Sequence, residues 1–249
     1  MVIFGAVFLF SMGSVLRIML EYRAIDKLYE ESAAEYTRVI TDDSPREEKE
    51  VEVEEEAENA VPITVDFAAL RKINEDVVGW IYCEGTNINY PVLQRKDNNY
   101  YLNHNYRGGE DRAGSIFVEA YNTMNFADSN TIIHGHHMKN GAMFATLGDW
   151  ADQAYYEEHP TMWLLTPEQN YQVVLFSGYI TKAVSNAYRI FRTDCPEFEE
   201  YLQEAVANSD FRADVEIDSS EKFVVLSTCE YHFENARYVL HGMLVPFEE

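Results

Sequence analysis

Residues 222–245 of the sequence read KFVVLSTCEYHFENARYVLHGMLV. The stretch contains two runs rich in Val, Leu and aromatic residues, 222–229 and 237–245, and runs of this kind are typical of β-strands. The short connection between them predicts an antiparallel hairpin. In that hairpin Cys229 ends the first strand and Arg237 begins the second, so we expect the two side chains to lie close together across its mouth.

This placement gives Cys229 the surroundings that an acyl-transferring cysteine needs. A permanent cation beside a thiol lowers the pKa of the thiol and can also stabilise a developing oxyanion. Along the strand, Val225, Ser227 and Cys229 share one face. The sequence holds 3 cysteines, too few and too scattered for a disulfide framework. We interpret the other two, Cys83 and Cys195, as small apolar residues.

Six further runs of similar composition precede the hairpin. They are VVGWIYC (77–83), NINYPVL (87–93), GSIFVEA (114–120), SNTIIHG (129–135), TMWLLTP (161–167) and YQVVLFSGYI (171–180). Eight strands at this density predict a mostly β protein built on a closed or nearly closed eight-stranded barrel. Residues 66–75, 142–159 and 196–209 have helical character, and the last of these stretches lies between the sixth and seventh strands.

A cluster of histidines follows the fourth run, in SNTIIHGHHM (129–138). His134 and His136 are expected on one face of the strand and His137 on the other, while Gly135 permits the close approach of another backbone. One of these side chains could supply the base that the thiol requires. Histidines satisfied within the core are one alternative, and a zinc site is another, because imidazoles at i and i+2 can chelate zinc. A third ligand of obvious spacing does not follow, so we predict neither a metal nor a cofactor.

The amino terminus has a different composition. Residues 2–20 are apolar except for Arg17 and are long enough for the hydrocarbon core of a bilayer. They predict an uncleaved transmembrane signal anchor over residues 1–20, with the protein in the cell membrane as a single-pass chain and its folded domain extracellular; a cleaved signal peptide is the alternative. The positive-inside rule does not support this orientation, because Arg17 and Arg23 follow the apolar run and none of the basic residues precedes it.

Residues 21–61 are predicted to form a membrane-proximal spacer, and residues 62–249 the folded domain. From Ile18 to Val39 the apolar residues recur at helical spacing, which predicts a helix with one apolar face that docks on the main domain or on a partner. Residues 42–60 hold ten acidic and two basic residues. Self-repulsion and the lack of large apolar side chains make this stretch a solvated linker.

The charge of the whole chain excludes one class of partner. Against 19 Lys and Arg stand 43 Asp and Glu, for a formal net charge of −24. Such a chain repels the phosphate backbone of nucleic acids. We therefore expect no nucleic-acid partner.

Three of these features together resemble a known family, the sortases, which are cell-surface transpeptidases of Gram-positive bacteria. They are TIIHGHHM (131–138), a strand ending in LSTC (226–229), and an arginine eight positions after the cysteine. The resemblance runs from about residue 66 to residue 245 and includes DNNYYLNHNYRGGEDRAGSIF (97–117). The N-terminal helices and the helix between the sixth and seventh strands resemble class B. The resemblance implies a sortase-like β-barrel.

The resemblance also implies roles for individual residues. By similarity Cys229 is the nucleophile, His136 the general acid and base, and Arg237 the residue that orients the substrate and stabilises the oxyanion. Further residues are expected to bind the substrate in a groove around the nucleophile. These residues are Ser227, Thr228, Glu230, Asn98, Leu102 and Tyr188.

The activity implied by the resemblance is peptide transfer at the cell wall. Secreted surface proteins with a C-terminal sorting signal, of the Asn-Pro-x-Thr type for class B, would be cleaved after Thr. The acyl group would pass through a cysteine thioester to an amine of a cell-wall peptide or peptidoglycan precursor. Two alternatives remain open: a cysteine peptidase that hydrolyses peptidoglycan stem peptides, and a noncatalytic metal-binding surface domain.

Overall fold

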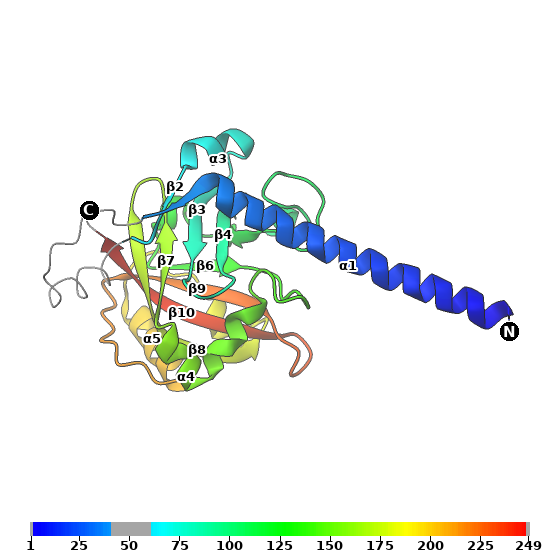
Figure 1. Cartoon of the computed structure of the whole chain (residues 1–249). Coiled ribbons are helices and arrows are strands. Elements are labelled where there is room, and N and C mark those ends of the chain that lie inside the picture. Colours follow the sequence, from blue (N-terminus) through cyan, green and yellow to red (C-terminus); the bar gives the residue numbers. More distant parts are fainter. Residues whose placement is uncertain (1, 41–60, 248–249) are drawn as a thin grey trace, which may run out of the picture.

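Eight strands close into a barrel in the computed structural model, which describes residues 2–40 and 61–247 (Figure 1). The strands are β3 (Val77–Tyr82), β4 (Asn89–Gln94), β5 (Ile116–Val118), β6 (Asn130–His134), β7 (Thr161–Leu165), β8 (Asn170–Lys182), β9 (Lys222–Cys229) and β10 (Ala236–Phe247). Around the barrel they follow the order β10-β8-β7-β3-β4-β5-β6-β9. Each strand lies within or overlaps one of the eight predicted runs, so the predicted fold class is confirmed.

Two of the neighbouring pairs in the barrel are parallel, β4 with β5 and β6 with β9, and the others are antiparallel. The strands read as nearly continuous apolar runs because both of their faces are covered. In β9, every residue from Phe223 to Thr228 is buried. A strand covered on both faces loses the polar–apolar alternation of a half-exposed strand. The parallel pairing of β6 with β9 places the histidine strand beside the cysteine strand.

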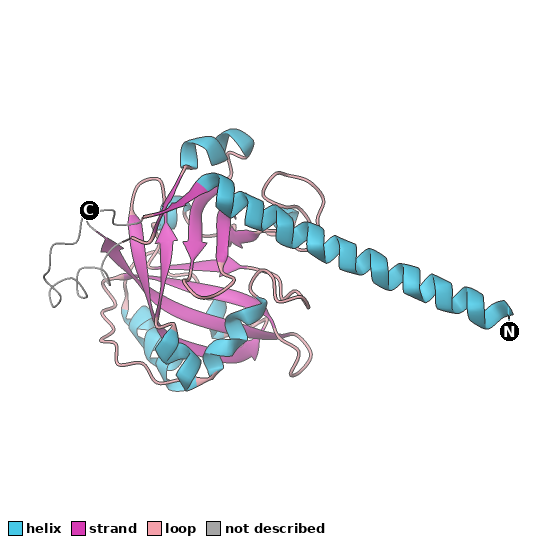
Figure 2. Cartoon of the chain, in the orientation of Figure 1, coloured by secondary structure: helices cyan, strands magenta, loops and turns pink. Residues whose placement is uncertain are grey.

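Short helices fill the connections of the barrel (Figure 2). They are the α-helices α3 (Phe67–Ile73), α4 (Gln153–Glu158) and α5 (Pro196–Asn208) and the 3₁₀ helices η1 (Tyr100–Leu102), η2 (Met124–Phe126), η3 (Ala145–Ala151) and η4 (Asn186–Tyr188). The helix predicted over 142–159 is divided between η3 and α4. Asp152 adopts an extended conformation there, and its side chain accepts a hydrogen bond of 2.8 Å from the backbone N–H of Ala154. This N-cap ends one helix and begins the next.

Helix α5 lies between β8 and β9, where the sequence predicted a helix, and covers the outside of the barrel. Its buried residues include Phe198 and Tyr201, and a separate apolar cluster joins them to Phe176 of β8 and Phe223 of β9. The rings of Phe198 and Phe223 meet edge to face, with centroids 5.6 Å apart. This packing anchors the outer surface of the cysteine strand.

The amino-terminal helix α1 (Val2–Tyr36) is continuous across the boundary predicted at residue 20. Its carboxyl-terminal half docks on the barrel, and Ile25, Tyr29, Ser32 and Tyr36 are buried at a spacing of four, three and four residues. That spacing keeps the four side chains on one face of the helix. The other half of α1 projects away from the barrel (Figure 1).

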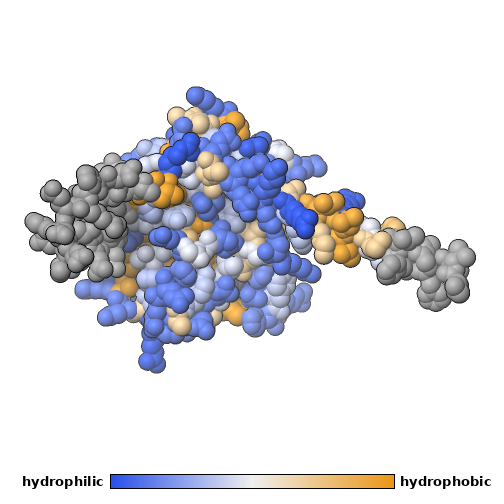
Figure 3. Space-filling model, viewed as in Figure 1, coloured by the Kyte–Doolittle hydropathy of each residue, from blue (hydrophilic) through white to orange (hydrophobic). Residues whose placement is uncertain are grey.

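The prediction of a single-pass membrane helix is wrong for the part of the chain that the structure describes. Among the residues that can be placed, none of the helices combines the length and the apolar character that a bilayer crossing requires. The first side chain of α1 that the structure describes is that of Phe10. Three charged side chains follow it within four turns of the helix, those of Arg17, Glu21 and Arg23. A span needs about 20 mostly apolar residues, and charged side chains are costly within it. Figure 3 shows apolar side chains gathered on the projecting turns before the charged ones.

After α1 the chain forms a small two-stranded sheet, which the sequence did not predict. Strands β1 (Thr37–Val39) and β2 (Ile63–Val65) pair antiparallel, with Thr37 opposite Val65 and Val39 opposite Ile63. The sheet brings together the two ends of the acidic stretch. The predicted linker over 42–60 itself lies outside the described residues.

Candidate active site

A cavity of about 360 Å³ opens where β6 and β9 end. Its lining includes every residue to which the family resemblance assigns a role, except Glu230. These are Asn98, Leu102, His136, Tyr188, Ser227, Thr228, Cys229 and Arg237. They come from parts of the chain more than 130 residues apart, so the closed barrel is what brings them together.

The hairpin of β9 and β10 sets Cys229 beside Arg237. The register places the two residues directly opposite each other, in the last pair of the ladder. The backbone N–H of Glu230 donates to the carbonyl of Ala236 (2.9 Å) just beyond this pair, and Asn235 takes a positive φ of 60° in the turn. Both Cys229 and Arg237 are partly exposed and line the cavity. The guanidinium of Arg237 can therefore stabilise negative charge that develops during a reaction at the sulfur of Cys229.

His136 is held on the other side of the cavity by three hydrogen bonds. Its carbonyl accepts from the N–H of Phe144 (3.0 Å), and the N–H of the preceding Gly135 donates to the carbonyl of Ser227 (3.0 Å). The imidazole Nε2 lies 2.8 Å from the carbonyl oxygen of Leu102. Since a carbonyl can only accept, this hydrogen bond requires a proton on Nε2. Nδ1 is then the nitrogen at which His136 gains or loses a proton.

The close approach at this point requires glycine at position 135. A Cβ there would lie 2.5 Å from Cδ1 of Ile116 and 2.7 Å from the ring of Phe144. Gly135 follows β6 directly, and its N–H reaches the cysteine strand. The glycine thus joins the histidine loop to β9.

The three histidines of the cluster face three different partners. His134 Nε2 lies 3.1 Å from Oε2 of Glu119, whereas His137 Nδ1 lies 2.8 Å from the backbone oxygen of Cys229. His134 lines the cavity with His136, and His137 lies outside its lining. In the described part of the chain, no group of three or more His, Cys, Asp or Glu side chains is placed to hold a metal. Each imidazole has a protein partner of its own instead.

Glu119 is a residue of the site that the sequence analysis missed. Its carboxylate accepts from Asn98 Nδ2 as well as from His134. Burial opposes ionisation of Glu119, but the hydrogen bonds from His134 and Asn98 outweigh it and lower its pKa. A signal was available, because Glu119 lies near the end of the predicted run 114–120. It directly follows β5, which pairs Phe117 with His134 of β6.

Tyr188 and Ser227 form the part of the cavity wall next to Arg237. The Tyr188 hydroxyl lies 2.6 Å from Oγ of Ser227. Burial raises the pKa of Tyr188, although the hydrogen bond to Ser227 and the charge of Arg237 act in the opposite direction. The ring of Tyr188 is nearly parallel to that of His134, with centroids 6.3 Å apart. The hydroxyl therefore stays protonated and polar within the wall.

Glu230 lies away from the cavity, although we predicted it in the groove. Its Oε1 accepts from the N–H of Tyr231 (2.7 Å) and lies 3.3 Å from Nδ1 of His232. Its other carboxylate oxygen lies near Gly148 of η3. Position next to the nucleophile in sequence does not by itself place a side chain in the groove, and the Glu230 carboxylate contacts Tyr231 and His232 instead.

The two other thiols lie outside this cavity. Cys83 is buried, and burial raises its pKa to about 12. A thiol with that pKa is protonated at neutral pH and is a poor nucleophile. Cys195 is the N-cap residue of α5, on the outside of the barrel.

Comparisons with known proteins agree with this geometry. A family model described as a sortase domain matches residues 81–245. Sortase B of Listeria monocytogenes is 42% identical over 181 residues, which cover 71% of this chain and 72% of that protein. Sortase B of Staphylococcus aureus is 37% identical over 164 residues, which cover 66% of this chain and 67% of that protein.

Solved structures are similar over a comparable or larger part of the chain. The Staphylococcus aureus sortase B–substrate complex has a TM-score of 0.68 and 35% identity, covering 73% of this chain and 85% of that one. Sortase B from Bacillus anthracis in complex with AAEK1 has a TM-score of 0.73 and 32% identity, covering 92% of this chain and 99% of that one. The second comparison extends the similarity beyond the barrel.

Proposed function

Because this chain belongs to the sortase family, in class B, and is a cysteine transpeptidase, we propose that Cys229, His136 and Arg237 carry out its reaction. The observation that supports these roles most is the pairing of Cys229 with Arg237 in the last rung of the β9–β10 ladder. His136 lines the same cavity. A nucleophile, a proton carrier and a fixed cation are the parts that acyl transfer through a thiol requires.

In the first half of the proposed reaction, the thiolate of Cys229 attacks the carbonyl carbon of a Thr residue in the substrate. The electron pair of the C=O bond moves to oxygen, and the guanidinium of Arg237 stabilises that oxyanion. As the tetrahedral intermediate collapses, the C–N bond breaks and the imidazolium of His136 gives its Nδ1 proton to the leaving amine. A thioester on Cys229 and a neutral His136 remain.

In the second half, an amine acceptor attacks the thioester carbonyl. His136 takes the proton from the incoming amine, and the C–S bond breaks to restore the thiolate. The Leu102 carbonyl keeps Nε2 protonated throughout, so Nδ1 alone changes its proton. The product is a new amide bond.

We expect the substrate to be a secreted surface protein with a C-terminal sorting signal of the Asn-Pro-x-Thr type, cleaved at Thr. The acceptor would be an amine of a cell-wall peptide or peptidoglycan precursor. The structure of a relative described as a substrate complex supports a peptide in this cavity. Asn98, Leu102, Tyr188, Ser227 and Thr228 line the cavity and are the candidate peptide contacts. Residues 62–249 would make up the catalytic domain.

Product analysis with and without an added amine tests the transfer step. A transpeptidase forms an amide with the added amine and hydrolyses the thioester only slowly without it. A peptidase that hydrolyses stem peptides gives the same free acid in both reactions. For the motif, a peptide screen in which a Leu-Pro-x-Thr-Gly signal outpaces every Asn-Pro member would contradict the proposed substrate.

A further inference from the structure

The imidazole of His136 depends on two loops, and both of them touch helix α1. One is the segment from Tyr100 to Gly114, whose Leu102 carbonyl binds Nε2 of His136. The other is the loop 135–144, which carries His136 and is closed by the hydrogen bond from Phe144 N–H to the His136 carbonyl. The start of the second loop is also tied to the cysteine strand, by the hydrogen bond from Gly135 N–H to the Ser227 carbonyl. The orientation of His136 is therefore set by how these loops are held.

Three side chains of α1 contact the first loop. Glu21 and Glu35 form exposed ion pairs with Arg112 and Arg107, and Tyr29 makes the buried contact. The hydroxyl of Tyr29 donates to the carbonyl of Gly114 at 2.6 Å, in a buried contact between residues 85 positions apart. Gly114 has a φ of +57°, and a Cβ there would lie 2.2 Å from the Tyr101 oxygen and 2.9 Å from the Leu102 oxygen. The backbone that Tyr29 binds is thus packed directly against the carbonyl that binds His136.

The second loop meets the same tyrosine through a neighbouring ring. The rings of Tyr29 and Tyr90 pack edge to face, with centroids 5.2 Å apart at 82°. The hydroxyl of Tyr90 accepts a hydrogen bond of 3.0 Å from the N–H of Met143, next to Phe144 in the histidine loop. One turn earlier on α1, Asp26 accepts from Asn140 Nδ2 at 2.7 Å.

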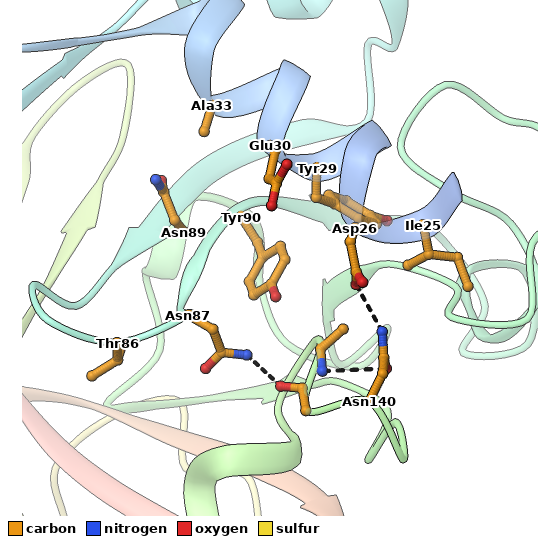
Figure 4. Close-up of a pocket in the computed structure, with 12 residues that line it drawn as sticks. Ile25, Asp26, Tyr29, Glu30, Ala33, Thr86, Asn87, Asn89, Tyr90 and Asn140 are labelled. Atoms are coloured by element: carbon orange, nitrogen blue, oxygen red, sulfur yellow. Dashed lines mark hydrogen bonds between the residues drawn. The ribbon is translucent and has the colours of Figure 1, made fainter. Parts of the chain in front are cut away.

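Figure 4 shows this arrangement around a cavity of about 480 Å³ between α1 and the histidine loop. Tyr29 and Asp26 come down from the helix, Tyr90 and Asn87 come from the barrel side, and Asn140 comes from the loop. Because the space between the helix and the loop is not filled by side chains, few contacts fix the loop there. Each of these polar contacts therefore matters to its position.

We propose that Tyr29 is a positioning residue for His136, and that docking of α1 on the barrel fixes the two loops that orient the imidazole. This proposal rests on the proposed role of His136 in proton transfer. A misplacement of about 1 Å in a reacting group can cost on the order of 100-fold in rate. Burial raises the pKa of Tyr29 far above its ordinary value, so its hydroxyl remains a donor across the working pH range.

The test uses the whole chain and the variant Tyr29→Phe, which removes the hydroxyl and keeps the ring. We expect kcat for acylation to fall about tenfold, as for the loss of one buried hydrogen bond, with KM for the peptide within about twofold. Hydrogen–deuterium exchange should become faster in residues 100–114 and 135–144 and stay unchanged in β8 and β10. Faster exchange confined to these two loops separates positioning from a general loss of folded protein, which would lower the apparent kcat at unchanged KM but would also speed exchange in β8 and β10.

Tyr36→Phe is the matched control, because Tyr36 is also a buried tyrosine of α1. In the part of the chain that the structure describes, its hydroxyl donates to neither of the two loops; the side chain of Glu35 lies beside it, and Tyr106 and Arg107 of the first loop are nearby. We expect the control to keep the wild-type kcat. Equal losses in Tyr29→Phe and Tyr36→Phe would overturn the proposal, and so would unchanged kcat and unchanged exchange in Tyr29→Phe.

Asn140→Ala tests the proposal if Tyr29→Phe does not fold. Asn140 is exposed, so removing its side chain leaves the core intact. We expect faster exchange in 135–144 and a loss of several-fold in kcat, whereas wild-type values for both would overturn the proposal. His136→Ala, measured alongside, separates the proposed role of His136 in proton transfer from the proposed role of α1 in holding the loops. If that variant keeps its rate, the proposed role of His136 fails, while the exchange data still show whether α1 holds the loops.

Discussion

Arg237 stands opposite Cys229 because the two residues are register partners in an antiparallel pair. The guanidinium can present two donors in one plane to backbone or oxyanion acceptors, which the ammonium of lysine cannot do. We therefore predict that Arg237→Lys lowers the acylation rate nearly as much as Arg237→Ala. Single-turnover acylation of the two variants measures this. A lysine variant close to the wild-type rate would reduce Arg237 to a neighbouring positive charge.

The three histidines of the cluster should differ sharply in their effect on rate. His136→Ala removes the proposed proton carrier, and a general acid or base typically contributes about 10² to 10⁴ in rate. His134→Gln and His137→Gln should lose much less, because His134 faces Glu119 and His137 faces the backbone of Cys229. Single-turnover acylation of all three variants checks the assignment. Equal losses would favour a shared metal, and a larger loss at His134 would move the acid and base role there.

Most of the site could be predicted from the sequence, because its residues lie at strand ends or in recognisable motifs. Cys229, Arg237 and His136 follow from strand boundaries together with the family resemblance. Glu119 was not predicted as a site residue, because its importance depends on the pairing of β5 with β6, which brings Phe117 opposite His134. Glu230, which we also expected in the groove, is not among the residues that line the cavity. Its neighbourhood in sequence is the groove, but its side chain turns toward His232.

At the scale of elements, the junction between β6 and the histidine loop is tightly packed. A methyl group at Gly135 would enter the space of Ile116 and Phe144. Such overpacking typically costs about 1–3 kcal/mol, so Gly135→Ala should lower the free energy of unfolding by that amount. It should also slow acylation by at least about tenfold, because even small displacements of His136 are costly.

Gly148→Ala provides the matched control in the following 3₁₀ helix, since its Cβ would meet only the Glu230 carboxylate, at 3.4 Å. Urea denaturation and single-turnover acylation of both variants separate the two positions. Equal stability and rate for Gly135→Ala and the wild type would mean that this junction tolerates a side chain and does not fix the loop.

The strands were predictable as elements, and the helices less so. Runs rich in aliphatic and aromatic residues identify each barrel strand, whereas the break at Asp152 depends on one N-cap that a helical pattern conceals. The pair of β1 and β2 could not be predicted, because three-residue strands carry almost no periodic signal. The docked face of α1 was visible in its spacing, but its contact with the histidine loop through Asp26 and Asn140 is purely tertiary.

For the molecule as a whole, a buried histidine predicts how stability depends on pH. His241 of β10 is 1% exposed, and burial lowers its pKa to about 3. An unfolded histidine has a pKa of about 6.5. Below that pH the unfolded chain binds a proton that the folded chain does not, so stability is full above about pH 6.5 and falls as the pH drops toward 3.

The contribution of His241 can be isolated with His241→Gln, which does not titrate. Between pH 7 and pH 4.5 the wild type should lose about 2–3 kcal/mol more of its free energy of unfolding than the variant does. Urea denaturation at the two pH values gives the difference. Parallel losses in the two proteins would show that His241 is not the group responsible.

The N-terminal region shows the limit of sequence reasoning at this scale. An apolar run predicted a membrane anchor ending near residue 20, but the helix continues to Tyr36 and its described side chains become charged from Arg17 on. The spacing of the apolar residues from Ile18 to Val39 predicted a face that docks on the main domain, but it could not reveal that Tyr29 binds the backbone of Gly114.

The most direct test of the enzyme's mechanism is mass spectrometry of the intact protein after incubation with an Asn-Pro-x-Thr peptide. We predict an acyl adduct that maps to Cys229, disappears when an amine acceptor is added, and is absent from Cys229→Ala. Cys83→Ala and Cys195→Ala should form it as the wild type does, because both thiols lie outside the cavity. An adduct on Cys83 or Cys195, or turnover retained by Cys229→Ala, would contradict the assignment of the nucleophile.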